Sequence, residues 1–144
     1  MSVGGLAAVV DASVWVSLFI PHDAHHAASR LWLREHSAAG NPAIAPIILL
    51  AEIGGAIARR TGDSALGWQS VQQVQRVPGL RLVAINRKLG LLAATIAANG
   101  RLRGADTLYL AVAEQLNIPL ISWDSEQLAH AARSGTSYTP QDLL

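Results

Sequence analysis

Short apolar runs alternate with longer amphipathic stretches along this chain. Four of the apolar runs, at residues 6–10, 43–45, 80–85 and 120–123, consist mainly of aliphatic residues, which is typical of buried strands. Between them, apolar side chains recur at helical spacing. The pattern predicts helices at about residues 14–20, 24–38, 47–60, 64–76, 88–98, 103–114 and 126–133, and a short extended segment at 136–139.

Strands that alternate with helices are typical of a parallel sheet covered by helices on both faces. We therefore expect one domain, residues 1–144, with a three-layer α/β/α sandwich around a central parallel sheet of four to five strands. Right-handed connections place the carboxyl ends of all the strands at one edge of such a sheet. Ligands bind at this edge in open α/β sheets, so the residues that follow the strands are the first to inspect.

Two aspartates stand where predicted strands end. Asp11 stops the first apolar run, and Asp124 follows the fourth. Each aspartate also precedes a predicted helix, where an aspartate side chain caps the first turn, and Gln127 stands in capping-box position relative to Asp124. Capping alone and ligand binding are therefore alternative interpretations of both residues.

Two further acids lie in strongly apolar helical segments. The neighbours of Glu52 at helical spacing are apolar or small, so its carboxylate projects from an apolar face. Asp106 lies in the first turn of the most apolar helix, where the helix dipole stabilises an anion. An ion pair with Arg59 or Arg103 would be a structural explanation for Glu52. For Asp106, a helix cap or stabilisation by the helix dipole would be one.

A single site would explain all four acids together. A buried lone carboxylate is costly, and carboxylates that meet at a sheet edge repel one another unless a cation lies between them. Oxygen-only ligand sets select hard divalent ions such as Mg²⁺ or Mn²⁺. These ions polarise phosphoryl groups and activate water, which favours the hypothesis of a phosphodiesterase.

The composition narrows the possible functions. The chain has no cysteine, which excludes thiolate catalysis and cysteine-ligated zinc. Its net charge is only +1, so the charge alone does not indicate a nucleic-acid partner. Lys88 is the only lysine among eleven basic residues. The excess of arginine favours a phosphate-rich partner, although codon bias is an alternative explanation. No basic residue precedes the first apolar run and no apolar stretch reaches the roughly 18 residues that span a bilayer, so we expect a cytoplasmic protein without signal peptide or membrane segment.

The four acids occupy short motifs: VDASV at residues 10–14, LAEI at 50–53, GADTLYLA at 104–111 and LISWD at 120–124. In this order and spacing the motifs resemble those of the PIN-domain ribonucleases. Within that family the sequence is most similar to the VapC toxins of bacterial type II toxin–antitoxin pairs. The resemblance covers nearly the whole chain.

This resemblance implies an endoribonuclease that depends on Mg²⁺ or Mn²⁺ and leaves a 3′-hydroxyl and a 5′-phosphate. The acids that match the metal ligands are Asp11, Glu52, Asp106 and Asp124. Ser13 matches a hydroxyl that follows the first acid, and Ser122 matches one that precedes the last. Glu126 is the only acid near the position of a further ligand.

The resemblance also implies partners: an RNA substrate, a cognate antitoxin that covers the site, and a second copy of the chain in a homodimer. Trp15 and Trp32 could receive the antitoxin or belong to the core. Four arginines could contact the RNA backbone or lie on a solvated face. They are Arg59, Arg60, Arg101 and Arg103.

Two other functions fit parts of the pattern. A degenerate domain that binds RNA or protein without catalysis would keep the same fold. A phosphotransfer domain would use Asp11 as a nucleophile, but it needs a lysine after a later strand, and Lys88 opens a predicted helix instead.

Two remaining features favour structural explanations. The cluster His22, Asp23, His25 and His26 lacks an identifiable further zinc ligand, so we interpret it as a solvated helix start. Gly54 and Gly55 lie inside a predicted helix and form no phosphate loop, so we expect them to allow close helix packing.

Overall fold

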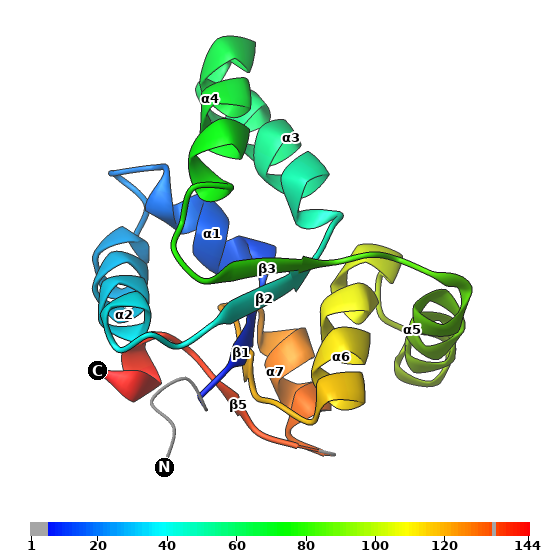
Figure 1. Cartoon of the computed structure of the whole chain (residues 1–144). Coiled ribbons are helices and arrows are strands. Elements are labelled where there is room, and N and C mark those ends of the chain that lie inside the picture. The colour runs from blue at the N-terminus through cyan, green and yellow to red at the C-terminus, as the bar shows by residue number, and fades with distance from the viewer. Residues whose placement is uncertain (1–5, 134) are drawn as a thin grey trace.

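A computed structural model of the chain describes residues 6–133 and 135–144 and contains a parallel sheet of five strands (Figure 1). The strands are β1 (Ala8–Val10), β2 (Ala43–Pro46), β3 (Leu80–Val83), β4 (Leu120–Ile121) and β5 (Ser137–Tyr138). Their order in the sheet is β3-β2-β1-β4-β5. The expected parallel sheet is confirmed, and the extended segment near the carboxyl terminus supplies its fifth strand.

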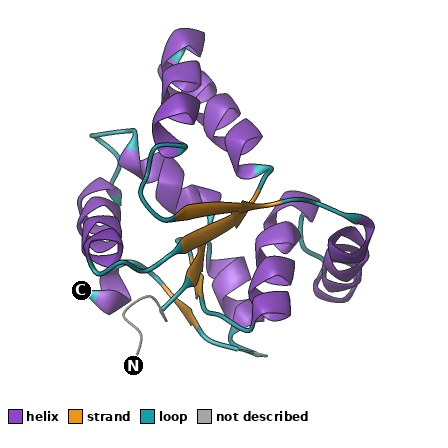
Figure 2. Ribbon diagram, viewed as in Figure 1, coloured by secondary structure: helices purple, strands orange, loops and turns teal. Residues whose placement is uncertain are grey.

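Helices cover both faces of this sheet (Figure 2). They are α1 (Ala12–Leu18), α2 (His26–Ala38), α3 (Leu49–Thr61), α4 (Ser64–Val74), α5 (Arg87–Gly100), α6 (Gly104–Leu116) and α7 (Ser125–Ala131), followed by the 3-10 turn η2 (Gln141–Leu143). Helices α6 and α7 pack on one side, with α5 outside α6, and α1 and α2 lie on the other side (Figure 1). The expected three-layer α/β/α sandwich is therefore confirmed.

Strand β1 lies at the centre of the sheet and at its topological switch point. From β1 the chain order runs outward to β2 and β3 on one side and to β4 and β5 on the other. The fully buried Val9 and Val10 pair with Leu120 and Ile121 of β4. Because a crevice opens where the strand order reverses, the residue after β1, Asp11, stands at the position that α/β folds use for ligands.

Helices α3 and α4 form a pair that extends away from the sheet (Figure 1). They cross at glycines: a Cβ atom at Gly67 would lie 2.7 Å from the backbone oxygen of Gly54, and one at Gly54 would lie 3.2 Å from Val71 Cγ2. The expectation that the glycine pair in this helix allows close packing is confirmed for Gly54. This crossing fixes the direction of the helix that carries Glu52.

Both tryptophans considered as antitoxin contacts belong to the core. Trp15 is fully buried and its Nε1 donates to the Val10 oxygen over 3.0 Å, while Trp32 is 5% exposed. Of the two interpretations, the one that assigns both tryptophans to the core is therefore confirmed. No helix among residues 6–133 and 135–144 is long and apolar enough to cross a membrane. The signal-peptide expectation concerns residues 1–5, which lie outside the described residues.

Candidate active site

The carboxylate of Asp11 is buried and held by hydrogen bonds at both oxygens. Its Oδ2 accepts from the backbone N–H of Ser13 over 3.0 Å, which caps α1, and lies 3.3 Å from the Ser122 hydroxyl. Its Oδ1 accepts from Gln127 Nε2 over 3.0 Å. With only 4% of the residue exposed, these donors replace the water that Asp11 loses on folding.

Gln127 connects three elements of the site. Besides Asp11, its Nε2 donates to the backbone oxygen of Asp106 over 3.1 Å, and its Oε1 accepts from the Ser122 hydroxyl over 2.8 Å. The side chain is fully buried, and every hydrogen-bonding group on it has a partner. Gln127 therefore fixes the distance between the end of β1 and the start of α6.

Asp124 caps α7, as one interpretation of the sequence predicted. Its Oδ1 accepts from the Gln127 backbone N–H over 2.9 Å, but its own N–H donates to the Ser122 hydroxyl rather than to the Gln127 side chain. The capping box is therefore only half formed, because the Gln127 side chain turns inward to Asp11. Ser13 joins the same network, since its hydroxyl accepts from the Trp123 N–H over 3.0 Å and lies 3.4 Å from that of Ser122.

Glu52 faces the site from the first turn of α3 and pairs with a buried tyrosine. The Tyr109 hydroxyl, on the fully buried ring of that residue, donates to Glu52 Oε1 over 2.6 Å. Burial raises the pKa of Glu52, and the charges of Asp11 and Asp106 raise it further against the opposing effect of the Tyr109 hydrogen bond. Burial and the neighbouring carboxylate also raise the pKa of Tyr109, so its hydroxyl keeps its proton.

Asp106 lies in the first turn of α6, as the sequence predicted, and the pKa of its carboxyl is strongly raised. Burial raises its pKa to about 6, with further contributions from the charges of Asp11, Asp124 and Glu126 that Arg103 only partly offsets. These effects require the acids to lie near one another. Asp106 also lies one helical turn from Tyr109, so the two face the same way from α6.

The four predicted acids are therefore brought to one edge of the sheet. Among the residues that the structure describes, no three histidine, aspartate or glutamate side chains surround a common point where an ion could be held. Capping and ligand binding do not exclude each other for Asp11 and Asp124, because each carboxylate caps a helix and also lies among the acids of the site. The described part of the chain contains an Arg60–Asp23 ion pair, but none between Glu52 and Arg59 or Arg103.

The predicted backbone-binding arginines lie on two flanks of the acids. Arg59 and Arg60 line a cavity that is also lined by Glu52, whereas Arg101 lines a smaller one with Glu126. Arg103 stands at the start of α6 and lowers the pKa of Asp106. All four are at the surface, so the structure leaves phosphate contact open to each of them.

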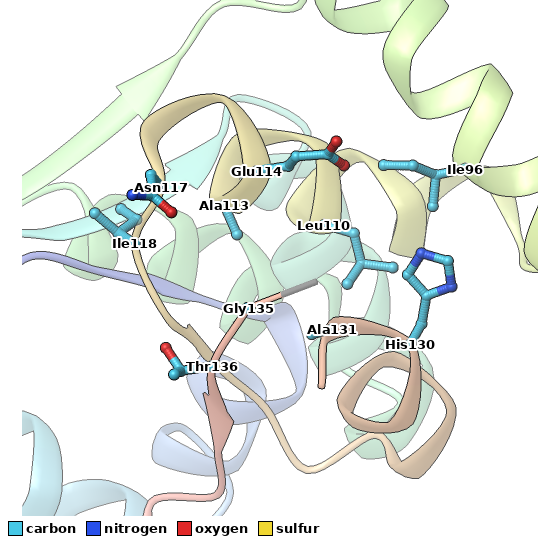
Figure 3. A pocket seen from close by; sticks show the side chains of 10 residues that line it. All are labelled: Ile96, Leu110, Ala113, Glu114, Asn117, Ile118, His130, Ala131, Gly135 and Thr136. Carbon is cyan, nitrogen blue, oxygen red and sulfur yellow. The ribbon is translucent and has the colours of Figure 1, made fainter. Parts of the chain in front are cut away.

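A separate cavity of about 250 Å³ lies between α6, α7 and the segment before β5 (Figure 3). Its walls carry Glu114, Asn117 and His130 among aliphatic side chains, and none of the four acids. It lies toward the carboxyl end of α6, whereas Asp106 is at the amino end, so it belongs to a different part of the molecule.

Sequence reasoning missed two residues of the site, Gln127 and Tyr109. Both are neutral, so the argument from buried charge passed over them. Each did carry a positional signal: Tyr109 follows Asp106 by three residues on the same helix face, and Gln127 follows Asp124 by three. The partner of each, however, comes from a distant part of the chain.

Comparison with known proteins agrees with this geometry. The model of the PIN domain family matches residues 8–134, which include all four acids, while a search of curated proteins finds no match. Among solved structures, the fold is similar to the VapC20 toxin of Mycobacterium tuberculosis, which cleaves the sarcin–ricin loop, with TM-score 0.70, 19% identity and coverage of 90% of this chain and 96% of that one. It is also similar to VapBC2 of Rickettsia felis bound to a promoter DNA fragment, with TM-score 0.69, 11% identity and coverage of 92% of this chain and 98% of that one. A third similar structure is VapBC-1 of nontypeable Haemophilus influenzae, with TM-score 0.67, 11% identity and coverage of 94% of this chain and 98% of that one.

The TM-scores establish a shared fold with these structures, and the family model covers most of the chain, from β1 to the segment after α7. The matched residues include the acids at the switch point of the parallel sheet, so the sequence match and the site geometry support the same family. The chain belongs to the PIN domain family.

Proposed function

We propose that this chain is an endoribonuclease that depends on Mg²⁺ or Mn²⁺. The observation that carries the proposal is the gathering of Asp11, Glu52, Asp106 and Asp124, from four separate elements, at one sheet edge, where neighbouring acid charges help to raise the pKa of Glu52 and of Asp106. Membership of the PIN domain family and the similar fold of a toxin that cleaves the sarcin–ricin loop support RNA as the substrate.

The donor set fits a hard divalent cation. It consists of carboxylate oxygens, and the raised pKa of Glu52 and of Asp106 reflects negative charge that a cation would neutralise. The residues that would hold the ion are the four acids. Since no three of them already surround one point among the described residues, binding would draw their side chains together.

The residues around the ion have distinct roles in this proposal. When bound, a cation of this kind polarises the phosphodiester and lowers the pKa of water. Gln127 and the Ser13 N–H hold Asp11 in place, and the Tyr109 hydroxyl binds one oxygen of Glu52 and leaves the other free. Asp106, whose pKa is about 6 without a cation, is an acid whose charged form a bound cation would stabilise.

We further propose that the ribonuclease is the toxin of a toxin–antitoxin pair, acts as a homodimer and is inhibited by an antitoxin protein. The support is its similar fold to toxin chains in VapBC assemblies from Rickettsia felis and Haemophilus influenzae. Expression of the chain alone is then expected to arrest growth, whereas the Asp11→Asn variant is not. A neighbouring gene for a DNA-binding antitoxin would support the pairing.

The test of catalysis is cleavage of RNA in Mg²⁺ by Asp11→Asn and Asp106→Asn, each compared with Glu114→Gln. Glu114 is an exposed acid on the same helix as Asp106 but at its far end, so it is a matched control. We expect both site variants to lose activity and the control to keep it. Wild-type cleavage by the site variants would refute the proposal, and absence of Mn²⁺ binding in a calorimetric titration would favour a non-catalytic binding domain.

A further inference from the structure

A cavity of about 520 Å³ opens beside the acids, between the loop that joins α1 to α2 and the outer face of α3. It shares Ser13 and Glu52 with the site. Its other polar and aromatic walls have no role in the proposal above. They are Asp23, His25, Arg59, Arg60 and Trp123.

One wall is an aromatic pair in a fixed orientation. The rings of His25 and Trp123 stack with centroids 3.8 Å apart and planes inclined by 10°. Trp123 cannot turn freely, because its Nε1 donates to the hydroxyl of the buried Ser29 over 2.8 Å and its backbone N–H donates to Ser13. His25 is exposed at the surface, so the pair presents a flat, preformed face at the mouth of the cavity.

The opposite wall is cationic. The Arg60 guanidinium bridges the mouth to Asp23 over 2.8 Å. Arg59 folds back along α3, where a Cβ atom at Gly55 would lie 3.0 Å from its Nη1. The absence of a side chain at Gly55 therefore lets Arg59 lie one turn from Glu52. Gly55 permits a close side-chain approach here, rather than the close helix packing predicted for it.

We propose that this cavity binds a nucleobase of single-stranded RNA next to the phosphodiester that is cleaved, with the base stacked on His25 and a flanking phosphate on Arg59. The inference rests on the proposed ribonuclease function and deepens it. Stacking on an aromatic platform beside arginines is how proteins bind unpaired nucleotides. The remaining walls are apolar, which suits the faces of a base, and the two arginines suit its phosphate. The apolar residues are Ala12, Val16, Ile48, Ala51 and Ala56.

The first experiment measures the affinity of a fluorescein-labelled pool of short single-stranded RNAs in EDTA, where no cleavage occurs. His25→Ala is expected to weaken binding about tenfold, because base–aromatic stacking is lost, and His25→Phe to restore it. His22→Ala, in the same exposed loop, is the matched control and is expected to bind like the wild type. Arg59→Met is expected to weaken binding and to reduce the salt dependence by about one phosphate contact.

The second experiment identifies the contact by removing a base. In an RNA that the wild type cleaves, each nucleotide in turn is made abasic, and His25→Ala is measured on every substrate. At the position bound by the cavity, the abasic change and His25→Ala are expected to be non-additive, whereas at other positions they add. Equal affinity of His25→Ala and wild type, or additive effects at every position, would overturn the nucleobase site while leaving the ribonuclease intact. A wild type that neither binds nor cleaves RNA would refute both.

Discussion

The two halves of the site are held in different ways. We call the first the β1–β4 corner, which contains Asp11, Ser13, Ser122, Asp124 and Gln127. We call the second the α3–α6 side, which contains Glu52, Asp106 and Tyr109. In the β1–β4 corner, neutral N–H and O–H donors satisfy the carboxylates at fixed positions. On the α3–α6 side, burial and mutual repulsion raise the pKa of both acids.

This difference indicates that the two halves have different roles in the site. A carboxylate surrounded by hydrogen-bond donors is stable in its charged form without a cation, so the β1–β4 corner is preorganised. A carboxyl with a raised pKa is destabilised when charged, and it gains most when a cation arrives. The raised pKa values of Glu52 and Asp106 therefore make the α3–α6 side sensitive to pH, and the same substitution should act differently in the two halves.

The largest expected effect comes from replacing one aspartate in each half by asparagine. Both Asp11→Asn and Asp106→Asn are expected to lower RNA cleavage by more than the about 10–100-fold that loss of an outer-shell partner costs. Their effects on stability should be opposite. Asp11→Asn replaces an acceptor by an NH₂ group that faces donors and is expected to cost about 1–3 kcal/mol. Asp106→Asn removes a repelled charge and should raise the melting temperature in EDTA.

The melting temperatures of wild type, Asp11→Asn and Asp106→Asn, measured with and without Mn²⁺, test these two expectations. Wild type should be stabilised by the cation through preferential binding to the folded state, and both variants should lose most of that shift. If both variants were destabilised equally in EDTA, the contrast between the two halves would be wrong.

The next largest effect is expected from Gln127→Leu, which removes the connection between Asp11, Ser122 and α6. Because a misplaced ligand binds metal less well, activity and Mn²⁺ affinity should fall about 10–100-fold. Gln72→Leu on α4 is the control, since that glutamine is exposed. A folded Gln127→Leu variant with the activity of the control would show that the connection serves folding alone.

The pH dependence tests the α3–α6 side by itself. Since Asp106 has a pKa of about 6, its protonated form competes with the cation, and Mn²⁺ affinity should fall about tenfold between pH 7 and pH 5. Without metal the sign reverses: the folded state binds this proton more tightly than the unfolded state, so the contribution of Asp106 to stability improves as the pH falls from above 6 toward 4. Calorimetric titrations and melting curves of wild type and Asp106→Asn measure both, and identical pH profiles would contradict the assignment.

The smallest effect concerns the packing that orients Glu52. In Gly67→Ala, the new methyl group would clash with the Gly54 oxygen, at an expected cost of about 1–3 kcal/mol in unfolding free energy. Gly90→Ala on α5 is the matched control, because nothing lies within 4 Å of a Cβ there, and it should stabilise by about 0.5–1 kcal/mol. Chemical denaturation compares the two. Equal stability would mean that the α3–α4 crossing is looser than the structure indicates.

The sequence predicted those features that depend on local pattern and topology. Apolar runs located the strands. Because parallel strands end at one edge of a sheet, the sequence alone also predicted that Asp11 and Asp124 lie close together. Two helix boundaries differ from the predicted ones because a capping residue determines them. Helix α1 begins at Ala12, since Asp11 caps it. Helix α5 continues through Gly100, since Arg101 takes the left-handed conformation at its end. A Cβ atom at Gly100 would lie 3.1 Å from His130 Nδ1 and 3.2 Å from Leu102 Cδ1, so glycine fits this close approach without a shift of either side chain.

What the sequence did not predict are partnerships between residues far apart in the chain. The hydrogen bond from Tyr109 to Glu52 spans 57 residues and that from Gln127 to Asp11 spans 116. No local pattern encodes such a distance, and a buried glutamine has no periodicity of its own. The stacking of His25 on Trp123 was missed for the same reason, since each residue taken singly looks like part of a solvated helix start or a strand end.

The double role of Asp11, as cap of α1 and as acid at the sheet edge, restricts how this domain can lose its chemistry over generations. A change to alanine would remove the carboxylate and the side-chain cap of α1 in the same event, at a cost of about 0.5–2 kcal/mol in stability. Serine would remove the carboxylate and still cap the helix, so inactive descendants that remain well folded ought to favour a small capping residue after their first strand.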